Sequence, residues 1–253
     1  MENKAGKGEW IYGRRPVGEV FAAGRRRVFE LVLAAEGRES PAQAQARAAA
    51  ARPGAAVRRA DRRELEELSQ NGNHQGIAVR TGGFPYAGLD SVAGLVEKRK
   101  DALILVLDHL EDPQNLGSLL RTADAAGVHA VVIPGDRAAA VTPAVVRASA
   151  GASEHLRVVR VVNLVRAMGV LKEAGLWTVG LDTGGDDVRP YTAIDFTGRT
   201  GIVVGSEGHG LKRLTREACD FVARLPMQGA VASLNAGVAG AICLYEALRQ
   251  RGA

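Results

Sequence analysis

Short hydrophobic runs alternate with amphipathic segments from residue 101 to the end of the chain. Uninterrupted apolar runs are typical of strands that are buried on both faces of a parallel sheet. Such runs predict strands at 103–107, 130–133, 157–161, 177–181, 202–204 and 221–225. Helical patterns predict helices at 116–126, 143–150, 164–173 and 236–251. Because the two kinds of segment alternate, we expect an α/β domain whose parallel sheet is covered by helices.

The first 80 residues predict a second, smaller α/β module. Strands are expected at 28–33 and 76–79, and helices at 16–23, 41–51 and 61–68. Asp61 is the expected N-cap of the last of these helices. Residues 1–10 are polar and are expected to be disordered. The predicted organisation is an N-terminal module at 1–80, a linker at 81–100 and a larger domain at 101–253.

Basic side chains are concentrated in the N-terminal module. The chain has 33 Lys and Arg against 28 Asp and Glu, a formal net charge of +5. Residues 1–80 hold 15 of the basic and 10 of the acidic residues, so this module carries the whole excess. The arginines form the clusters Arg14-Arg15, Arg25-Arg26-Arg27, Arg58-Arg59 and Arg62-Arg63. Such clusters favour contact with nucleic-acid phosphates, although a solvated arginine-rich surface would have the same composition.

Composition argues against several classes of protein. No apolar run is long enough to span a membrane, and the N-terminus MENKAGKGEW lacks the apolar core of a signal peptide. The two cysteines, Cys219 and Cys243, lack metal-ligand spacing and fit buried thiols in a reducing cytoplasm. Aromatic residues make up only 4% of the chain, which argues against a base-stacking platform of the RNA-recognition-motif kind. We therefore expect a cytoplasmic protein without a metal.

Two segments rich in Gly, Ser and Asn follow the strands predicted at 202–204 and 221–225. The first reads Gly205-Ser206-Glu207-Gly208-His209-Gly210, and the second ends in Ser233-Leu234-Asn235. Loops of this kind at strand ends indicate a ligand site at the carboxyl edge of the sheet. The glycine spacing differs from the dinucleotide-binding pattern, and no Walker A lysine follows a glycine loop. These differences argue against nicotinamide or flavin enzymes and against the common NTPases.

A third segment follows the first strand of the larger predicted domain. It contains Asn115, Gly117 and Arg121 in the pattern Asn-x-Gly-x-x-x-Arg. Asn115 is a candidate N-cap, Gly117 allows close approach of the backbone, and Arg121 lies further along the same predicted helix. Taken singly, Asn115 is best explained as a plain cap and Arg121 as a partner in a surface ion pair.

Together, the three segments resemble the signature motifs of the SpoU family of RNA 2′-O-ribose methyltransferases. They read NLGSLLRTADAAG, VVGSEGHGL and LPMQGAVASLNAGVAGAICLYEALR, in the family's order and at its separations. The resemblance covers residues 101–253, and NHQGI at 73–77 is similar to the end of the family's small RNA-binding domain. Within the family, the chain looks most like the 23S rRNA guanosine 2′-O-methyltransferases. It departs from the pattern at His109, where a smaller residue is expected.

The resemblance implies a fold, a cofactor and an assembly. The fold would be the SPOUT α/β type, with a deep trefoil knot formed by the C-terminal segment, and the protein would be a homodimer through the knot. The cofactor would be S-adenosylmethionine and the partner RNA, with no metal. The residues implied to hold the cofactor are Gly205, Leu225, Met227, Ser233 and Leu234.

The resemblance also assigns catalytic roles to Arg121, Asn115, Glu207 and Asn235. A guanidinium stays protonated at ordinary pH, so Arg121 either binds the target phosphate and stabilises the developing alkoxide or is made basic by that contact. Glu207 either fixes its glycine loop through backbone N–H groups or orients Arg121 or the ribose. Asn235 is the N-cap of the last helix, a substrate contact, or both.

Three other functions fit parts of the sequence. A tRNA guanosine 2′-O-methyltransferase would have similar motifs, but such enzymes tend to carry basic extensions at both ends. A resistance-type rRNA adenosine 2′-O-methyltransferase would share the architecture. A non-catalytic RNA-binding protein would be expected to lose Arg121 or the Ser-Leu-Asn block, and both are intact. Methylation of a 23S rRNA guanosine is therefore the preferred hypothesis.

Overall fold

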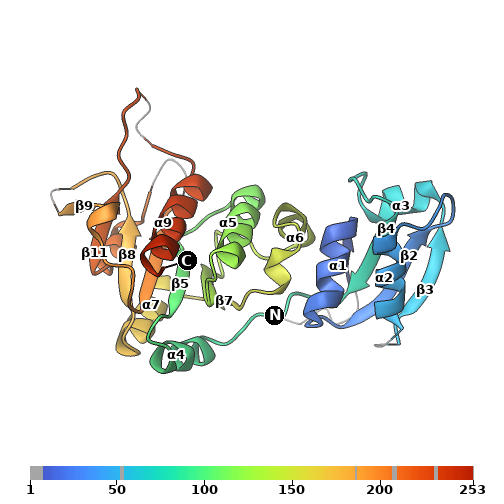
Figure 1. Ribbon diagram of the computed structural model, residues 1–253, viewed down its shortest axis with the longest axis horizontal. Coiled ribbons are helices and arrows are strands. Elements are labelled where there is room, and N and C mark those ends of the chain that lie inside the picture. The colour runs from blue at the N-terminus through green and yellow to red at the C-terminus, as the bar shows by residue number, and fades with distance from the viewer. Residues whose placement is uncertain (1–7, 52–53, 186, 207–209, 231–232, 253) are drawn as a thin grey trace. The chain divides into compact units, whose positions relative to one another are not determined.

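The computed structural model describes residues 8–51, 54–185, 187–206, 210–230 and 233–252. The chain groups into two compact units, and many of their elements are labelled in Figure 1. The first unit comprises Met1–Pro85 and Val141–His155, and the second comprises Tyr86–Ala140 and Leu156–Ala253. The segment 141–155 thus groups with the N-terminal residues, although the sequence prediction places it inside the larger domain.

The second unit is built on a seven-stranded parallel sheet. The strand order is β7-β6-β5-β10-β8-β11-β9, and every pairing between neighbours is parallel. The strands are β5 (Leu103–Leu107), β6 (Ala130–Pro134), β7 (Val158–Val161), β8 (Trp177–Leu181), β9 (Val188–Pro190), β10 (Thr200–Val204) and β11 (Phe221–Arg224). β5, β6 and β10 are buried along their whole length, as expected inside a covered parallel sheet. The predicted α/β class is confirmed.

Helices cover the sheet of the second unit. They are α4 (Leu89–Lys98), α5 (Pro113–Ala125), α7 (Leu164–Glu173), α8 (Arg213–Glu217) and α9 (Ala236–Gln250), with a short 3₁₀ helix η2 (Tyr191–Ala193). α4 packs against α7, and α5 packs against α9. Val203 of β10 belongs to the core cluster with α4 and α7, whereas Val204 faces Gly240 of α9. Because successive strand residues point to opposite faces, the two helix pairs cover opposite faces of the sheet.

The carboxyl ends of the central strands lie level with one another. Val204, the last residue of β10, pairs with Leu107 at the end of β5 and with Leu181 at the end of β8. The loops that follow these strands therefore start at one edge of the sheet. This edge is where open α/β sheets place their ligands.

The first unit contains a four-stranded sheet of order β1-β4-β2-β3. β4 is antiparallel to both of its neighbours, and β2 is parallel to β3. The elements are β1 (Glu9–Tyr12), α1 (Arg14–Ala23), β2 (Val28–Ala34), α2 (Pro41–Ala50), β3 (Ala56–Ala60), α3 (Arg62–Leu68), β4 (Ile77–Thr81), α6 (Pro143–Ala148) and the 3₁₀ helix η1 (Ala152–Glu154). Asp61 accepts a hydrogen bond of 2.8 Å from the Glu64 amide, which confirms it as the N-cap of α3.

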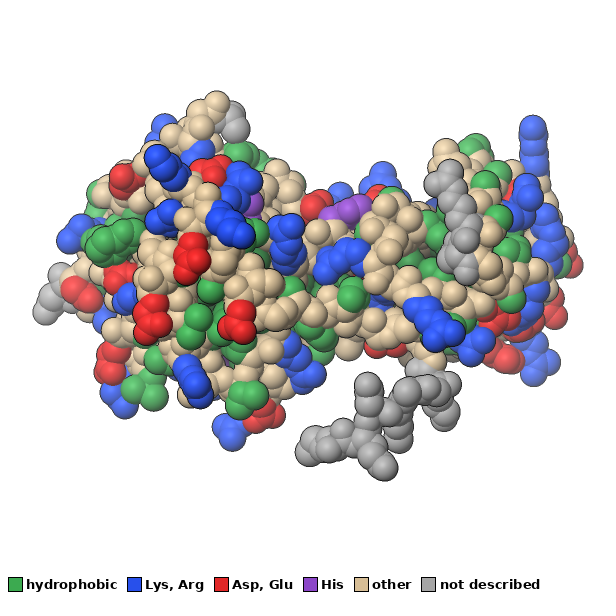
Figure 2. Space-filling view, turned by 90° about the horizontal axis from the view of Figure 1, so that it is seen from below, with side chains coloured by type: hydrophobic (Ala, Val, Ile, Leu, Met, Phe, Trp, Pro, Cys, Tyr) green, Lys and Arg blue, Asp and Glu red, His purple; other side chains and the backbone are tan. Residues whose placement is uncertain are grey.

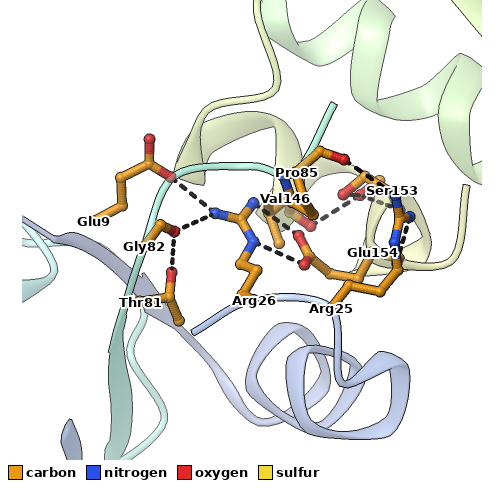
Figure 3. A network of polar contacts seen from close by, with 10 residues as sticks. Glu9, Arg25, Arg26, Thr81, Gly82, Pro85, Val146, Ser153 and Glu154 are labelled. Carbon is orange, nitrogen blue, oxygen red and sulfur yellow. Dashed lines mark hydrogen bonds and ion pairs between the residues drawn. The ribbon is translucent and has the colours of Figure 1, made fainter. Parts of the chain in front are cut away.

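A buried arginine joins the segment 141–155 to the rest of the first unit (Figure 3). Arg26 donates from Nε and Nη2 to the two carboxylate oxygens of Glu154, over 2.8 and 2.9 Å. Its Nη1 donates to Glu9 Oε2 at 2.9 Å and to the Gly82 carbonyl at 3.1 Å. Arg26 is 6% exposed and Glu154 only 1%. A bidentate pair this deeply buried is specific in geometry, and removing one partner leaves an uncompensated charge.

The elements that the sequence patterns missed are short or lie at sheet edges. Glu9 and Trp10 form the start of β1, although they fall in the leader predicted to be disordered; residues 1–7 of that leader lie outside the described residues. The other missed elements are β3, β9, α8 and the 3₁₀ helices η1 and η2. β3 and β9 have three to five residues with little burial, so their apolar periodicity is too weak to detect.

Candidate active site

A cavity opens at the carboxyl ends of β8, β10 and β11 in the second unit. Its walls contain every residue that the sequence assigned to cofactor binding, namely Gly205, Leu225, Met227, Ser233 and Leu234. The ends of the three strands also line it, through Leu181, Val204 and Ala223. The two glycine- and serine-rich loops, which are separated along the chain, are therefore brought together in one site.

The loop after β10 turns back sharply at the cavity. Ser206 and Gly210 exchange two backbone hydrogen bonds of 3.1 and 3.0 Å, and Gly210 has a φ of +64°. A Cβ atom at Gly205 would lie 2.2 Å from both C and O of Gly210, so a side chain does not fit there. Glu207 lies outside the described residues, and its predicted catalytic role stays a prediction.

Asp182 is a cavity residue that the sequence patterns did not single out. It follows β8, and its Oδ1 accepts hydrogen bonds from the amides of Thr183 and Gly184 at 2.7 and 3.3 Å. Arg216 Nε lies 3.6 Å from its Oδ2. Among the described residues of the cavity wall, Asp182 is the only carboxylate. The signal was present in the sequence, because Asp-Thr-Gly-Gly directly follows a predicted buried strand at the same sheet edge.

Asn115 and Asn235 meet although they are 120 positions apart in the chain. Asn235 is the N-cap of α9, and its Oδ1 accepts from the Val238 amide at 3.2 Å. Its Nδ2 donates to Asn115 Oδ1 at 3.0 Å. The prediction that Asn115 caps α5 is wrong, because the helix begins earlier and Asp112 is the cap. Asn115 therefore lies in the first turn with its side chain directed to Asn235.

Arg121 lies apart from this amide pair. It is an exposed residue of α5, and it makes no hydrogen bond or ion pair with any residue that the structure describes. At about 3.6 residues per turn, the six positions from Asn115 to Arg121 correspond to a rotation of about 240° around the helix. Arg121 thus occupies another face of α5 and does not line the cavity. The surface ion pair that was the alternative explanation for Arg121 is absent among the described residues.

A hydrogen bond joins the residue after β5 to the residue that precedes α8. Asp108 is fully buried, and it accepts a hydrogen bond of 2.7 Å from the Lys212 amide. His109 Nδ1 lies 2.5 Å from the other carboxylate oxygen. His109 has a φ of +56°, a left-handed conformation that glycine adopts most readily and that histidine tolerates better than most residues. This conformation explains why a smaller residue was expected at position 109.

The donor set of the site suits an organic ligand. The described residues contain no cluster of three His, Cys, Asp or Glu side chains that could hold a metal. Within the same residues, no helix has both the length and the hydropathy needed to cross a bilayer. The cavity combines apolar walls with the hydroxyl groups of Ser206 and Ser233 and the carboxylate of Asp182. This combination fits a small organic ligand that has both apolar and polar groups.

Residues 102–245 match the model of the SpoU rRNA methylase family, and residues 10–87 match the substrate-binding domain of RNA 2′-O-ribose methyltransferases. The chain belongs to the SpoU rRNA methylase family. Members of this family are RNA 2′-O-ribose methyltransferases that use S-adenosylmethionine, and the resemblance inferred from the three motifs is confirmed.

Relatives match along nearly the whole chain. The 23S rRNA (guanosine-2′-O-)-methyltransferase RlmB of Pseudomonas aeruginosa is 43% identical over 96% of this chain and 97% of its own length. YacO of Bacillus subtilis, whose name assigns it to the TrmH family of tRNA/rRNA methyltransferases, is 39% identical over 96% of each chain. The crystal structure of the SpoU methyltransferase AviRb from Streptomyces viridochromogenes, in complex with AdoMet, superposes with a TM-score of 0.79. That pair is 29% identical, and the match covers 96% of this chain and 90% of AviRb.

Proposed function

We propose that this SpoU-family protein methylates the ribose 2′-hydroxyl of a guanosine in 23S rRNA. The observation that carries the proposal is the cavity at the ends of β8, β10 and β11, because its walls hold all five predicted cofactor residues. The identity of 43% to RlmB of Pseudomonas aeruginosa supports guanosine in 23S rRNA as the target.

The cavity residues fit S-adenosylmethionine. When bound, this cofactor supplies a methyl group that its sulfonium already activates, so the protein has to position the acceptor hydroxyl in line and exclude water. Leu181, Leu225 and Leu234 provide apolar surface for the adenine, and the backbone around Gly205 leaves room for close approach. Asp182 offsets part of the cofactor's positive charge.

Arg121 acts on the RNA rather than on the cofactor. A ribose hydroxyl is a very weak acid, and negative charge develops on its oxygen during attack. Contact with a phosphate strengthens the protonated form of a guanidinium, so we assign Arg121 to the target phosphate and the developing alkoxide, not to proton removal. As the C–O bond forms and the S–C bond breaks, the hydroxyl proton passes to solvent. Its exposure and its lack of a carboxylate partner among the described residues leave its donors available to RNA.

The amide pair lies at the start of α9, whose first residue, Ala236, lines the cavity. The Val238 amide donates to Asn235 Oδ1, which leaves Asn235 Nδ2 to donate to Asn115 Oδ1. Asn115 Nδ2 then remains as a donor for a substrate oxygen. Asn235 thus serves as both the helix cap and the residue that orients Asn115.

The proposal includes a homodimer, a knot and a cytoplasmic location. Val238 and Tyr245 lie seven positions apart on α9 and are about half exposed, which supports a protein contact on this helix face. β10 lies between β5 and β8, both of which precede it in the chain. The knot is inferred from membership of the SpoU family and not from this strand order.

Methyl transfer from labelled S-adenosylmethionine tests the proposed function. Unmodified 23S rRNA and bulk tRNA would be incubated separately with the protein, and the modified ribose would be mapped in each. We expect one 2′-O-methylguanosine in 23S rRNA and none in tRNA. The name of YacO keeps tRNA as the second candidate substrate, and labelling of tRNA alone would replace the proposal with it.

A further inference from the structure

A second cavity, of about 540 Å³, lies in the first unit at the start of α1. Its volume falls within the range of roughly 300–1,000 Å³ that is usual for ligand sites. Tyr12, Arg14 and Arg15 line it from the N-terminal part of the chain, and Arg147 lines it from the segment 141–155. No carboxylate is among its described lining residues. Three arginine residues and one tyrosine therefore line the same cavity.

Charge alone does not locate an RNA site on this protein, because basic and acidic side chains are interspersed on the face that Figure 2 shows. The ion pairs are more informative. Three of the four arginine clusters in the first 80 residues contain members that are paired with carboxylates. The paired arginines are Arg26 (Glu154 and Glu9), Arg58 (Glu30 and Glu64), Arg62 (Glu66) and Arg63 (Glu67). Their charges are compensated within the protein.

Arg14, Arg15 and Arg147 differ from these arginines. None of the three has a carboxylate within 4.0 Å in the part of the chain that the structure describes, and all three are exposed. Arg14 and Arg15 also occupy the first two positions of α1, whose first turn has no acidic residue. Cations at this end of a helix oppose its dipole and cost stability. Residues that are unfavourable for their local structure, and that no other contact compensates, are expected where function requires them.

The aromatic wall of the cavity is held in place. The Arg147 guanidinium carbon lies 5.4 Å from the centroid of the Tyr12 ring, and the guanidinium also donates to the Tyr12 hydroxyl. On its other side the ring packs so closely against Gly72 that a Cβ there would lie 2.2 Å from the hydroxyl oxygen. The Gln75 side chain accepts from the Arg14 amide at 2.9 Å and fixes the neighbouring turn. These contacts hold the Tyr12 ring in a fixed position at the cavity.

We propose that this cavity binds a backbone phosphate of the substrate RNA through Arg14, Arg15 and Arg147. The inference rests on the proposed function for the nature of the substrate. A guanidinium matches the planar, bidentate geometry of a phosphate, and several uncompensated guanidiniums around one cavity select an anion. Arg147 is supplied by the segment 141–155, so the RNA site of the first unit is completed by residues from the middle of the chain.

Paired charge variants of the full-length protein test the inference. Arg14→Gln with Arg15→Gln removes two cavity charges, and Arg147→Gln removes the third. Arg62→Gln with Arg63→Gln is the matched control, because it removes the same charge from α3 in the same unit. The affinity for unmodified 23S rRNA would be measured between 50 and 200 mM salt, with the KM for RNA and the affinity for S-adenosylmethionine alongside.

We expect the Arg14/Arg15 variant to bind RNA about tenfold more weakly for each RNA phosphate that it no longer neutralises. The slope of log affinity against log salt should fall by about 0.7 to 0.9 for each such phosphate. The control should change RNA affinity less than about twofold, since its charges are already paired. Arg147→Gln should also raise the KM for RNA, and Tyr12→Phe, which keeps the ring, should raise it less. Inorganic phosphate should compete only weakly if the site reads an RNA backbone.

Equal losses of RNA affinity in the Arg14/Arg15 variant and in the control would overturn the inference. The proposed function fails separately, if the wild-type protein binds 23S rRNA but transfers no methyl group to it. Unchanged affinity for S-adenosylmethionine in every variant shows that the second unit is intact.

Discussion

The two cavities of this protein are built from different parts of the polypeptide. The cavity of the second unit is shaped by backbone, with Gly205 pressed against Gly210 and apolar side chains around them. The cavity of the first unit has the exposed arginines Arg14, Arg15 and Arg147 among its lining residues and no described carboxylate. We therefore expect ligand binding in the second unit to respond to added volume and little to salt, and ligand binding in the first unit to respond to charge and salt.

Replacing Arg121, which lines neither cavity, should give the largest effect, because it removes a group assigned to the reacting oxygen itself. Arg121→Ala is expected to lower kcat by about 10³-fold, the loss typical of removing a donor to a developing oxyanion. Affinity for S-adenosylmethionine should stay as in the wild type. Single-turnover methylation of 23S rRNA and calorimetric cofactor binding measure the two quantities.

Arg213→Ala is the control for Arg121, because Arg213 is an exposed arginine of the same unit whose charge is paired with Glu217. Arg121→Lys keeps the charge but loses the bidentate geometry, so its rate should also fall. Near-normal turnover of the lysine variant would refute the role assigned to Arg121.

Breaking the buried pair of the first unit should destabilise that unit without affecting the second. Glu154→Gln leaves the Arg26 charge buried with only Glu9 as its carboxylate partner. We expect the free energy of unfolding of the first unit to fall by about 3 kcal/mol. Glu66→Gln, which breaks the exposed pair with Arg62, should cost less than about 1 kcal/mol. Urea unfolding followed by circular dichroism makes the comparison, and similar losses of stability in both variants would contradict it.

The sequence predicted the second unit better than the first. Strands 103–107 and 177–181 and helix 164–173 have the predicted bounds, because buried parallel strands are continuous apolar runs. The loops at the cofactor cavity were also predicted, because glycine and serine directly after a predicted strand can be recognised in the sequence. Asp182 was missed only because its loop was not considered.

The cavity of the first unit could not be predicted from the sequence in the same way. Arg147 and Tyr12 lie 135 positions apart and meet only in the folded unit. The sequence also does not show which arginines are compensated, because the partners of Arg26 and Arg58 come from other elements. The start of α5 was also predicted wrongly, because Asp112 rather than Asn115 is its N-cap.

Adding one methyl group to the loop after β10 should weaken cofactor binding. The expected effect is smaller than the effects of Arg121→Ala and Glu154→Gln. Gly205→Ala places a Cβ against the Gly210 backbone, which cannot move as a flexible side chain would. Overpacking of this kind costs about 1–3 kcal/mol, so the affinity for S-adenosylmethionine should fall about 10- to 100-fold. Gly169→Ala in α7 is the control, because a Cβ there meets nothing within 4 Å. RNA affinity should be retained in both variants. A loss of RNA affinity in Gly205→Ala would contradict the assignment of cofactor to one cavity and RNA to the other.

The smallest effect is expected for the two cysteine thiols. Both lie in the second unit, so their reactivity reports on the packing of that unit. Burial raises the pKa of Cys219 and of Cys243 to about 12, from an ordinary value near 9. Iodoacetamide at pH 8 should therefore modify neither thiol in the native protein and both in urea, as measured by mass. Glu154→Gln should keep this protection. Between pH 9 and 12 the unfolded chain loses these protons while the folded chain keeps them, so the free energy of unfolding should decrease as the pH rises above about 9. Rapid labelling of the native protein at pH 8 would show that the second unit opens more readily than its packing indicates.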